Sequence, residues 1–222
     1  MPTSDPAAIQ SRRDLRRLNV VMGNAAVFSR LLDAHKATRW MRRLVDLGGG
    51  DGTLLLRVAR RVARRCGGVQ AVVVDRQALV SARTRRDFEA LGWGVEAATA
   101  DALEWLMRAP PRDGTVMVAN LFLHHFHEPP LGALLAQIAA RTELFLACEP
   151  RRSWLALGAS RLVGWIGCNA VTRHDATVSV RAGFAGRELS SFWPDRDDWH
   201  AEEGPAGLFN HVFVAGRRSG SG

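Results

Sequence analysis

Short apolar runs alternate with amphipathic segments along most of the chain after residue 43. Each run has four to six residues, which is the usual length of a buried strand and too short for an ordinary helix. The runs lie at 44–47, 70–74, 94–99, 115–120 and 143–148. Between them, apolar residues recur at helical spacing in 53–65, 77–90, 101–108 and 129–141. This alternation predicts an α/β fold, in which helices cover both faces of a parallel sheet.

The N-terminal part of the chain departs from this alternation. Residues 15–40 show helical spacing that breaks at Gly23, where a glycine interrupts the apolar pattern. We expect residues 1–14 to be disordered, because they hold few apolar side chains. The sequence therefore predicts a helical extension over 1–40, followed by one main domain over 41–222.

The C-terminal part contains a long helical insertion, which we expect over 153–195, and a last strand over 211–218. The segment 197–210 before that strand has little strand character. It contains four residues that are uncommon in strands, Glu202, Glu203, Gly204 and Pro205. Whether a further strand forms there is left open by the pattern.

A glycine cluster follows the first predicted strand, in the stretch LVDLGGGDGTLLLRVARR from Leu44. In a doubly wound sheet, ligands bind beyond the carboxyl ends of the strands, and glycines there let the backbone approach a ligand closely. A dinucleotide site requires GxGxxG, but Thr53 occupies the third glycine position here. Asp46, in the strand end, is unfavourable beside a pyrophosphate. It suits a ligand with positive charge, such as the sulfonium and ammonium of S-adenosylmethionine.

VDLGGGDG resembles the glycine motif of the class I S-adenosylmethionine-dependent methyltransferases, and further motifs follow in that family's order. Asp75 ends the second strand 23 residues after Gly52, Asp101 follows the third strand, and NLFLHHF begins at Asn120 after the fourth. The resemblance covers roughly 41–150. It implies a Rossmann-like, doubly wound α/β fold, with a mostly parallel seven-stranded sheet, helices on both faces and an antiparallel strand near the C-terminus.

The resemblance also implies a set of cofactor-binding residues. Asp75 would bind the ribose hydroxyls of S-adenosylmethionine, and Asp101 the adenine amino group, with Ala102 beside the ring. The whole set comprises Asp46, Gly48, Gly49, Gly50, Gly52, Asp75, Arg76, Asp101, Ala102, Asn120 and Leu121. Taken alone, Asp75 is equally well explained as the N-cap of a helix.

Methyl transfer is an in-line displacement that needs no metal, so the remaining chemistry is alignment and, for a phenol, removal of a proton. His124 and His125 follow the fourth strand at the edge where the methyl group would lie. On an extended segment neighbouring side chains point opposite ways, so only one of them would face the cleft. His174 lies in the insertion beside Asp175 and is a third candidate base. The alternative is that these histidines only shape loops.

Two other sets of residues each have two possible roles, one at the site and one purely structural. Glu149 and Arg151 follow the fifth strand, and they either contact substrate or pair with each other. The apolar residues of 154–171, together with Phe184, Phe192 and Trp193, either form a pocket wall or pack in the core.

The composition limits which binding partners we expect, namely nucleic acid, metal or membrane. The net charge is +8, but all 30 basic residues except Lys36 are arginines, spread as short pairs and not interleaved with aromatic side chains. We attribute this to GC-rich coding and expect no specific nucleic acid. The three cysteines share no metal-ligand or disulfide spacing, so no metal is expected. The N-terminus lacks the apolar core of a signal peptide, and 154–171 is marginal as a spanning helix. A cytoplasmic protein without integral membrane association is therefore expected.

The leading hypothesis is methyl transfer to oxygen or carbon of a small, largely apolar acceptor of phenolic, quinone-like or polyketide type. Residues 169–194 resemble small bacterial methyltransferases of polyketide and phenolic-lipid pathways, which implies a role in secondary metabolism. One alternative is an RNA methyltransferase, although NLFL differs from the NPPY-type signature that stacks a flipped base. The other is a non-catalytic S-adenosylmethionine-binding protein. The oligomeric state, a homodimer included, stays open.

Overall fold

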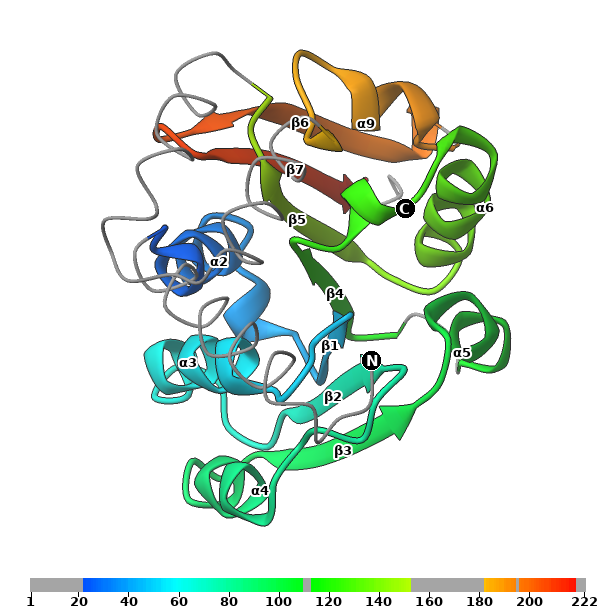
Figure 1. Ribbon diagram of the computed structural model, residues 1–222. Coiled ribbons are helices and arrows are strands. Elements are labelled where there is room, and N and C mark those ends of the chain that lie inside the picture. The colour runs from blue at the N-terminus through cyan, green and yellow to red at the C-terminus, as the bar shows by residue number, and fades with distance from the viewer. Residues whose placement is uncertain (1–21, 110–112, 153–181, 195, 219–222) are drawn as a thin grey trace, which may run out of the picture.

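The computed structural model describes residues 22–109, 113–152, 182–194 and 196–218, which are built around one seven-stranded sheet (Figure 1). The strand order is β3-β2-β1-β4-β5-β7-β6. The strands are β1 (Arg43–Leu47), β2 (Gln70–Asp75), β3 (Gly94–Thr99), β4 (Thr115–Asn120), β5 (Leu144–Pro150), β6 (Trp199–Ala206) and β7 (Asn210–Arg217). The first five are parallel to one another, and β7 is antiparallel to both β5 and β6. The predicted fold class is confirmed.

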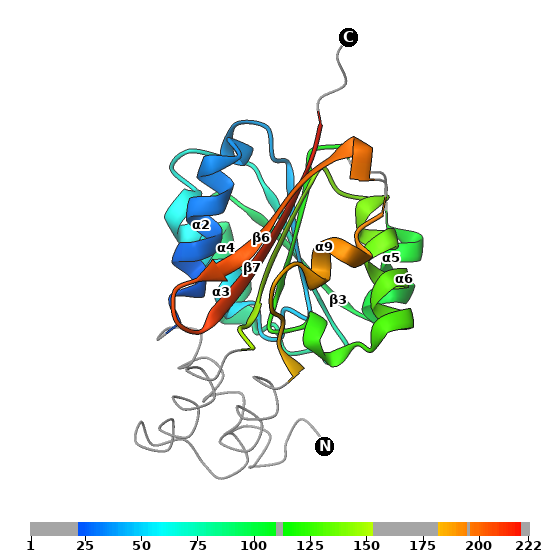
Figure 2. The same cartoon turned by 90° about the horizontal axis from the view of Figure 1, so that it is seen from above.

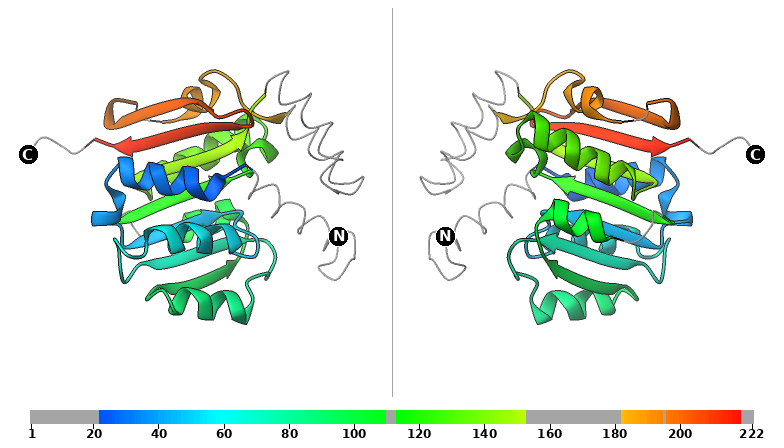
Figure 3. Two further views of the ribbon diagram at one scale, coloured as in Figure 1. Left: turned by 90° about the vertical axis from the view of Figure 1, so that its left-hand side faces the viewer. Right: turned by 90° about the vertical axis from the view of Figure 1, so that its right-hand side faces the viewer.

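Helices cover both faces of the sheet. On one face lie α2 (Asn24–Ala34), α3 (Thr53–Val62) and α4 (Ala82–Glu89), and on the other α5 (Ala102–Arg108), α6 (Glu128–Ala139) and α9 (Glu188–Phe192) (Figure 2). The short 3-10 turns are η1 (Ala37–Arg39), η2 (Leu123–His125) and η4 (Arg196–Asp198). Figure 3 shows the C-terminal hairpin at one end of the strand stack and β3 with α4 at the other.

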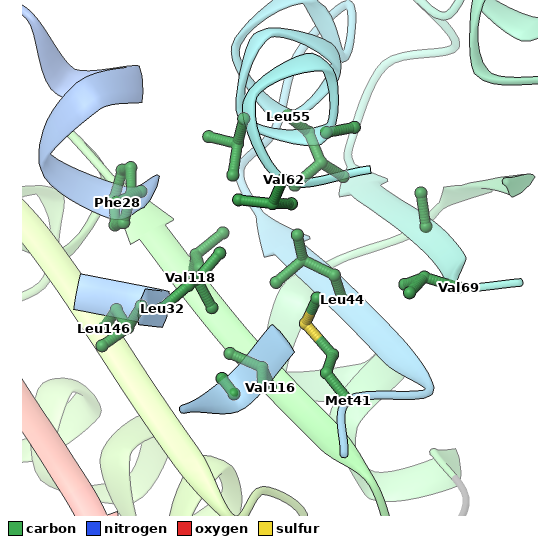
Figure 4. Packing of buried hydrophobic residues seen from close by; sticks show 14 of the residues in the cluster. Phe28, Leu32, Met41, Leu44, Leu55, Val62, Val69, Val116, Val118 and Leu146 are labelled. Atoms are coloured by element: carbon green, nitrogen blue, oxygen red, sulfur yellow. The ribbon is translucent and has the colours of Figure 1, made fainter. Parts of the chain in front are cut away.

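Each face has its own core, because successive strand residues point to opposite sides of the sheet. In β1, Leu44 packs under α2 and α3, while Val45 and Leu47 pack under α5 and α6. Phe28 and Leu32 of α2 are fully buried in the first of these cores (Figure 4). Burial of side chains of this size contributes about 1.5–3 kcal/mol each. The helix of the N-terminal extension therefore shares the core of the main sheet.

Two helices begin where local capping dictates. The predicted break at Gly23 is the N-cap of α2, and Gly23 has the left-handed φ of 66° that suits glycine. The helix predicted over 77–90 begins five residues late, at Ala82, because the hydroxyl of Ser81 accepts a hydrogen bond from the Thr84 amide at 3.1 Å and caps the helix there.

The strand left open by the sequence does form, as β6. Its full length pairs with β7, from Trp199 opposite Arg217 to Ala206 opposite Asn210. Trp199 is buried and meets Trp193 edge-on at 5.1 Å. Pro205 is tolerated because β6 is an edge strand, where a missing N–H need not break a ladder. Tertiary pairing thus outweighs the weak local propensity of this segment.

Candidate active site

The loop after β1 is a glycine turn whose backbone requires those glycines. Gly48, Gly50 and Gly52 have φ values of 71°, 57° and 72°, a region that side chains disfavour. The amides of Gly48 and Gly49 both donate to the carbonyl of Val74, at 2.8 and 3.1 Å, which holds the loop against β2. A Cβ at Gly48 would lie 2.3 Å from the Phe122 ring, so the turn is packed tightly on that side.

The same loop is open on another side. Among the described residues, nothing lies within 4 Å of a Cβ built at Gly50. The amide of Gly50 donates to Oδ2 of Asp75 at 3.0 Å, and the amide of Gln77 donates to Oδ1 at 2.9 Å. Asp75 therefore ties the glycine loop to the end of β2. Its predicted contact with the ribose stays a prediction.

Asp46 lies beneath this loop and is only 2% exposed. A Cβ at Gly49 would come within 2.9 Å of its carboxyl, which shows how closely the backbone covers it. Burial, together with the neighbouring carboxylates of Asp75 and Asp51, raises the pKa of Asp46 to about 8. The site therefore holds a buried acid that a nearby positive charge would help to ionise, under an open backbone turn.

The third acid, Asp101, meets Arg76 beside β2 and β3. Nε and Nη2 of Arg76 donate to Oδ2 of Asp101 at 3.1 and 2.5 Å. Oδ1 of Asp101 accepts from the Leu103 amide at 2.9 Å and caps α5. The Arg76 hydrogen bond lowers the pKa of Asp101, and the helix amides add to this against an opposing effect of burial. Ala102 is buried next to it.

The turn after β4 is held by a buried carboxylate from β5. Leu121 has a left-handed φ of 52° although it is not glycine. The next two amides, of Phe122 and Leu123, both donate to Oε1 of Glu149 at 2.9 Å. Oε2 of Glu149 lies 2.7 Å from Nδ1 of His124. The side chains of His124 and Glu149 are 4% and 0% exposed, so this pair is almost dry.

Glu149 and Arg151 do not pair with each other, which excludes one of the two interpretations that the sequence left open. The Glu149 carboxylate accepts hydrogen bonds from the turn after β4. Strand β5 ends at Pro150, and the backbone amide of Arg151 donates to the carbonyl of Phe209 at 2.8 Å. The picture of His124 and His125 on an extended segment is wrong, because both lie in the turn η2. His125 is exposed, and its ring centroid lies 4.1 Å from that of His124.

A second carboxylate–histidine pair lies beside the first and was missed by the sequence analysis. Nε2 of His211 in β7 is 2.7 Å from Oε1 of Glu203 in β6, with exposures of 2% and 0%. Glu203 also accepts from the amides of Leu189 and Ser190 and from the Ser190 hydroxyl, at 3.1, 2.7 and 2.6 Å. His211 stands opposite Glu149 in the β5–β7 register.

Burial alone would raise the pKa of Glu203, but the hydrogen bonds from His211, Ser190 and Leu189 outweigh it and lower the pKa. The sequence did indicate that His211 is buried, because it lies two and four residues before the buried Phe213 and Ala215 and so faces the same side of the strand. A histidine on the inward face of a strand requires a polar partner. Nothing in the sequence identified Glu203 as that partner.

The remaining predicted residues fall in three groups. Asn120 ends β4 and accepts a hydrogen bond from Nδ2 of Asn24 at 2.8 Å. Phe184 and Trp193 are buried core residues, and the Trp193 ring stacks on Phe145 at 5.5 Å, which supports the core reading for both. His174 and the segment 154–171 lie outside the described residues.

Two features are absent from the described part of the chain. No helix in it is long and apolar enough to cross a membrane. No group of three His, Cys, Asp or Glu side chains in it is arranged to hold a metal ion.

The residues at the glycine loop fit S-adenosylmethionine. An open left-handed turn admits a ligand against the backbone, and buried acid favours a cation over a pyrophosphate. Asp75 and Asp101 at the next two strand ends can accept hydrogen bonds from hydroxyl and amino groups.

Comparisons with known proteins agree with this chemistry. Residues 44–143 match the family model described as a methyltransferase domain. No curated protein matches the sequence of the chain significantly.

Three solved structures share the fold at low sequence identity. An O-methyltransferase family protein from Burkholderia thailandensis has 17% identity and a TM-score of 0.63, and the match covers 99% of this chain and 64% of that one. The plantazolicin methyltransferase BamL, solved with S-adenosylhomocysteine (SAH), has 11% identity, a TM-score of 0.69 and coverages of 97% and 93%. The small RNA methyltransferase HEN1 has 16% identity, a TM-score of 0.58 and coverages of 86% and 25%. The chain thus spans less than two thirds of the Burkholderia protein.

The family match lies on the part of the chain that carries the glycine loop and the three acids. Residues 44–143 therefore form a methyltransferase domain, and the chain shares the fold of S-adenosylmethionine-dependent methyltransferases.

Proposed function

We propose that this protein transfers the methyl group of S-adenosylmethionine to a hydroxyl oxygen of a small, largely apolar acceptor, and that His124 is the general base. The observation that carries the proposal is the 2.7 Å contact between Nδ1 of His124 and the buried carboxylate of Glu149. We place the enzyme in the cytoplasm and in secondary metabolism. A phenolic, quinone-like or polyketide acceptor suits this chemistry.

Glu149 determines which ring nitrogen of His124 acts as the base. A carboxylate only accepts hydrogen bonds, so it favours the neutral tautomer with its proton on Nδ1. Nε2 then carries the lone pair and accepts the proton of the acceptor hydroxyl. The amides of Phe122 and Leu123, which donate to the same carboxylate, keep Glu149 in place while the imidazolium forms beside it.

S-adenosylmethionine, when bound, supplies an activated methyl carbon for in-line displacement. The chain's own contribution is to align the acceptor oxygen, remove its proton through His124 and exclude water. The low exposure of the His124 side chain favours the exclusion of water. Without water, the interaction between the imidazolium and the Glu149 carboxylate is stronger.

The small-molecule reading is supported by the resemblance of 169–194 to methyltransferases of polyketide and phenolic-lipid pathways and by the fold shared with the plantazolicin methyltransferase. Several arginines are also already paired with acids, such as Arg60 with Asp87 and Arg65 with Asp33. Because the chain also shares its fold with the small RNA methyltransferase HEN1, the test below includes RNA as an acceptor.

The test is a methylation assay with labelled S-adenosylmethionine, a panel of phenols and hydroquinones, and total RNA. We expect incorporation into a phenolic acceptor, and a fall in kcat of about 10²–10⁴-fold for His124→Gln with an unchanged cofactor Kd. The loss should shrink at higher pH or with a more acidic phenol, which need less help from a base.

His200→Gln is the matched control, because His200 is an exposed histidine near the start of β6 that pairs with Glu202. It should leave kcat unchanged. A His124→Gln variant with kcat within about twofold of the wild type would overturn the assignment of the base. A loss at His125 or His174 instead would move it there. Incorporation into RNA alone would replace the acceptor class.

A further inference from the structure

The aromatic ring of Phe122 occupies the space in which a side chain at position 48 would lie. A Cβ built at Gly48 would come within 2.3 Å of Cδ2, 2.8 Å of Cγ and 2.9 Å of Cε2 of this ring. These distances are well below ordinary van der Waals contact, so no side chain fits at position 48 while the ring stays in place. Gly48 lies in the loop after β1, and Phe122 lies in the turn after β4. One aromatic ring therefore joins these two parts of the site.

Both sides of this contact are anchored. Gly48 is tied to β2, because its amide donates to the carbonyl of Val74 at 2.8 Å. Phe122 is tied to β5 through its own amide, which donates to Oε1 of the buried Glu149 at 2.9 Å. The Phe122 ring also meets the ring of Phe126 edge-on, with the two centroids 5.0 Å apart. The close contact is thus made between two segments of backbone that are each held from the other side.

The turn that carries Phe122 has a strained backbone. Leu121 has a φ of 52°, which residues other than glycine adopt at a cost in free energy, and such strain persists only where the surroundings hold it. The Glu149 carboxylate holds it, because it accepts hydrogen bonds at 2.9, 2.9 and 3.4 Å from three successive amides of the turn, those of Phe122, Leu123 and His124. The same carboxylate lies 2.7 Å from Nδ1 of His124. The place of the Phe122 backbone and the orientation of the His124 ring therefore depend on one anchor.

We infer that Phe122 is a positioning residue for methyl transfer, because its ring couples the glycine loop to the turn that carries the base. A shift of Gly48 toward that turn must displace the Phe122 ring, and a shift of the Phe122 backbone must disturb the hydrogen bonds between Glu149 and His124. The inference rests on the proposed function, since it takes His124 as the base. It gives position 48 a second requirement for glycine, besides the left-handed φ of 71°.

Gly50 supplies the matched control. Its φ of 57° lies in the same left-handed region, so an alanine is strained at both positions. Within the described part of the chain, however, the space around a Cβ at Gly50 is open to 4 Å. An alanine there meets no ring, so its cost does not depend on Phe122. The difference between the two positions separates the contact with the ring from backbone strain.

The test combines Gly48→Ala and Gly50→Ala with Phe122→Ala and measures the Kd of S-adenosylhomocysteine by calorimetry. Gly48→Ala should raise this Kd in the wild-type background, because the loop and the ring cannot both keep their places. With Phe122→Ala the clash is relieved, so the rise should be smaller by about 2- to 150-fold, the usual range of coupling between residues in contact. The rise caused by Gly50→Ala should be equal in the two backgrounds.

Two further measurements follow the effect to His124. In the complex with S-adenosylhomocysteine, the Cε1–H NMR signal of His124, assigned with the His124→Gln variant, should shift in Gly48→Ala and keep its wild-type position in Gly50→Ala. At saturating S-adenosylmethionine, Gly48→Ala should lower kcat for a phenolic acceptor more than Gly50→Ala does, and it should cause no further fall in the Phe122→Ala background. A residue that only stabilised the fold would instead add its effect to that of Gly48→Ala.

Thermal unfolding shows which variants fold. If Phe122→Ala does not, the His124 signal in Gly48→Ala and Gly50→Ala still decides the question, and if Gly48→Ala folds only together with Phe122→Ala, that rescue takes the place of the Kd comparison. An equal rise in Kd for Gly48→Ala in the two backgrounds would overturn the inference, as would a His124 signal that does not respond to Gly48→Ala. Calorimetry and NMR need no acceptor. They therefore stand even if the wild type methylates none of the phenols, which would count against the proposed function alone.

Discussion

The two halves of the carboxyl edge hold their carboxyl groups in different ways. Along β1 to β3, the acids Asp46, Asp75 and Asp101 face backbone amides, one another and a single arginine. Along β4 to β7, Glu149 and Glu203 are each paired with a buried histidine at 2.7 Å. Among the described residues, no histidine pairs with the acids of the first half, whereas Glu149 and Glu203 in the second half each have one.

This difference corresponds to two kinds of chemistry. An edge with an excess of buried acid gains most from a ligand that brings positive charge, which S-adenosylmethionine does. An edge whose carboxylates are matched by imidazoles can accept and release a proton without leaving a charge unpaired. The division supports a cofactor half and an acceptor half on one sheet.

The largest effect we expect concerns pH and Asp46. Its pKa is raised from 3.8 to about 8, so between these values the folded state binds a proton that the unfolded state has lost. The stabilisation is complete below pH 4 or so and is lost as pH rises through about 8, by ~5 kcal/mol at most. Without cofactor, urea unfolding from pH 5 to 9 should show this decline.

Asp46→Asn is the variant that isolates this effect, because an amide does not titrate. Its stability should lack the decline that the wild type shows over the same pH range. An identical pH profile in the two proteins would mean that folding does not raise the pKa of Asp46.

The next effect concerns Glu203, whose pKa is shifted in the opposite direction. A lowered folded pKa gives stability that is present above the unfolded value of about 4.5 and is lost as pH falls through the folded value. Glu203→Ala leaves His211 buried without its partner and should cost about 3 kcal/mol at pH 7 in urea unfolding. Acidification should then destabilise the wild type more than the variant.

Glu202→Ala is the matched control for that experiment. Glu202 is the neighbouring residue, is exposed and pairs with the exposed His200. Its loss should change stability by no more than about 0.5 kcal/mol. Equal costs at the two positions would contradict the contrast between a buried and a surface pair.

The smallest effect we expect is at Asp75 in the cofactor half. Asp75→Ala should weaken cofactor binding by about 1.5–3 kcal/mol, the range for hydrogen bonds to a charged group, because both the loop tie to Gly50 and the predicted ribose contact are lost. Calorimetry with S-adenosylhomocysteine measures it. Asp87→Ala, which removes an exposed pair with Arg60, is the control. Equal affinity in Asp75→Ala and the wild type would remove Asp75 from the site.

The cofactor half was predictable from sequence because its signals are local. The turn of Gly48 to Gly52 needs left-handed backbone, which only glycine supplies freely, so the requirement is written in consecutive residues. Asp75 and Asp101 stand at the ends of parallel strands, and parallel strands bring their carboxyl ends to one edge by topology alone. The fold class followed from the same alternation.

The acceptor half depended on the tertiary structure. His124 and Glu149 are 25 residues apart, and Asn24 lies 96 residues from Asn120, so no local pattern relates them. Glu149 could equally have paired with Arg151 until the turn after β4 came within its reach. Strand β6 needed the whole length of β7 to form. The sequence by itself determined which residues could do the chemistry at the glycine loop, whereas the register of the sheet and the packing of α2 decided which distant polar groups meet, because a buried donor or acceptor takes whatever partner the fold brings within 3 Å or so.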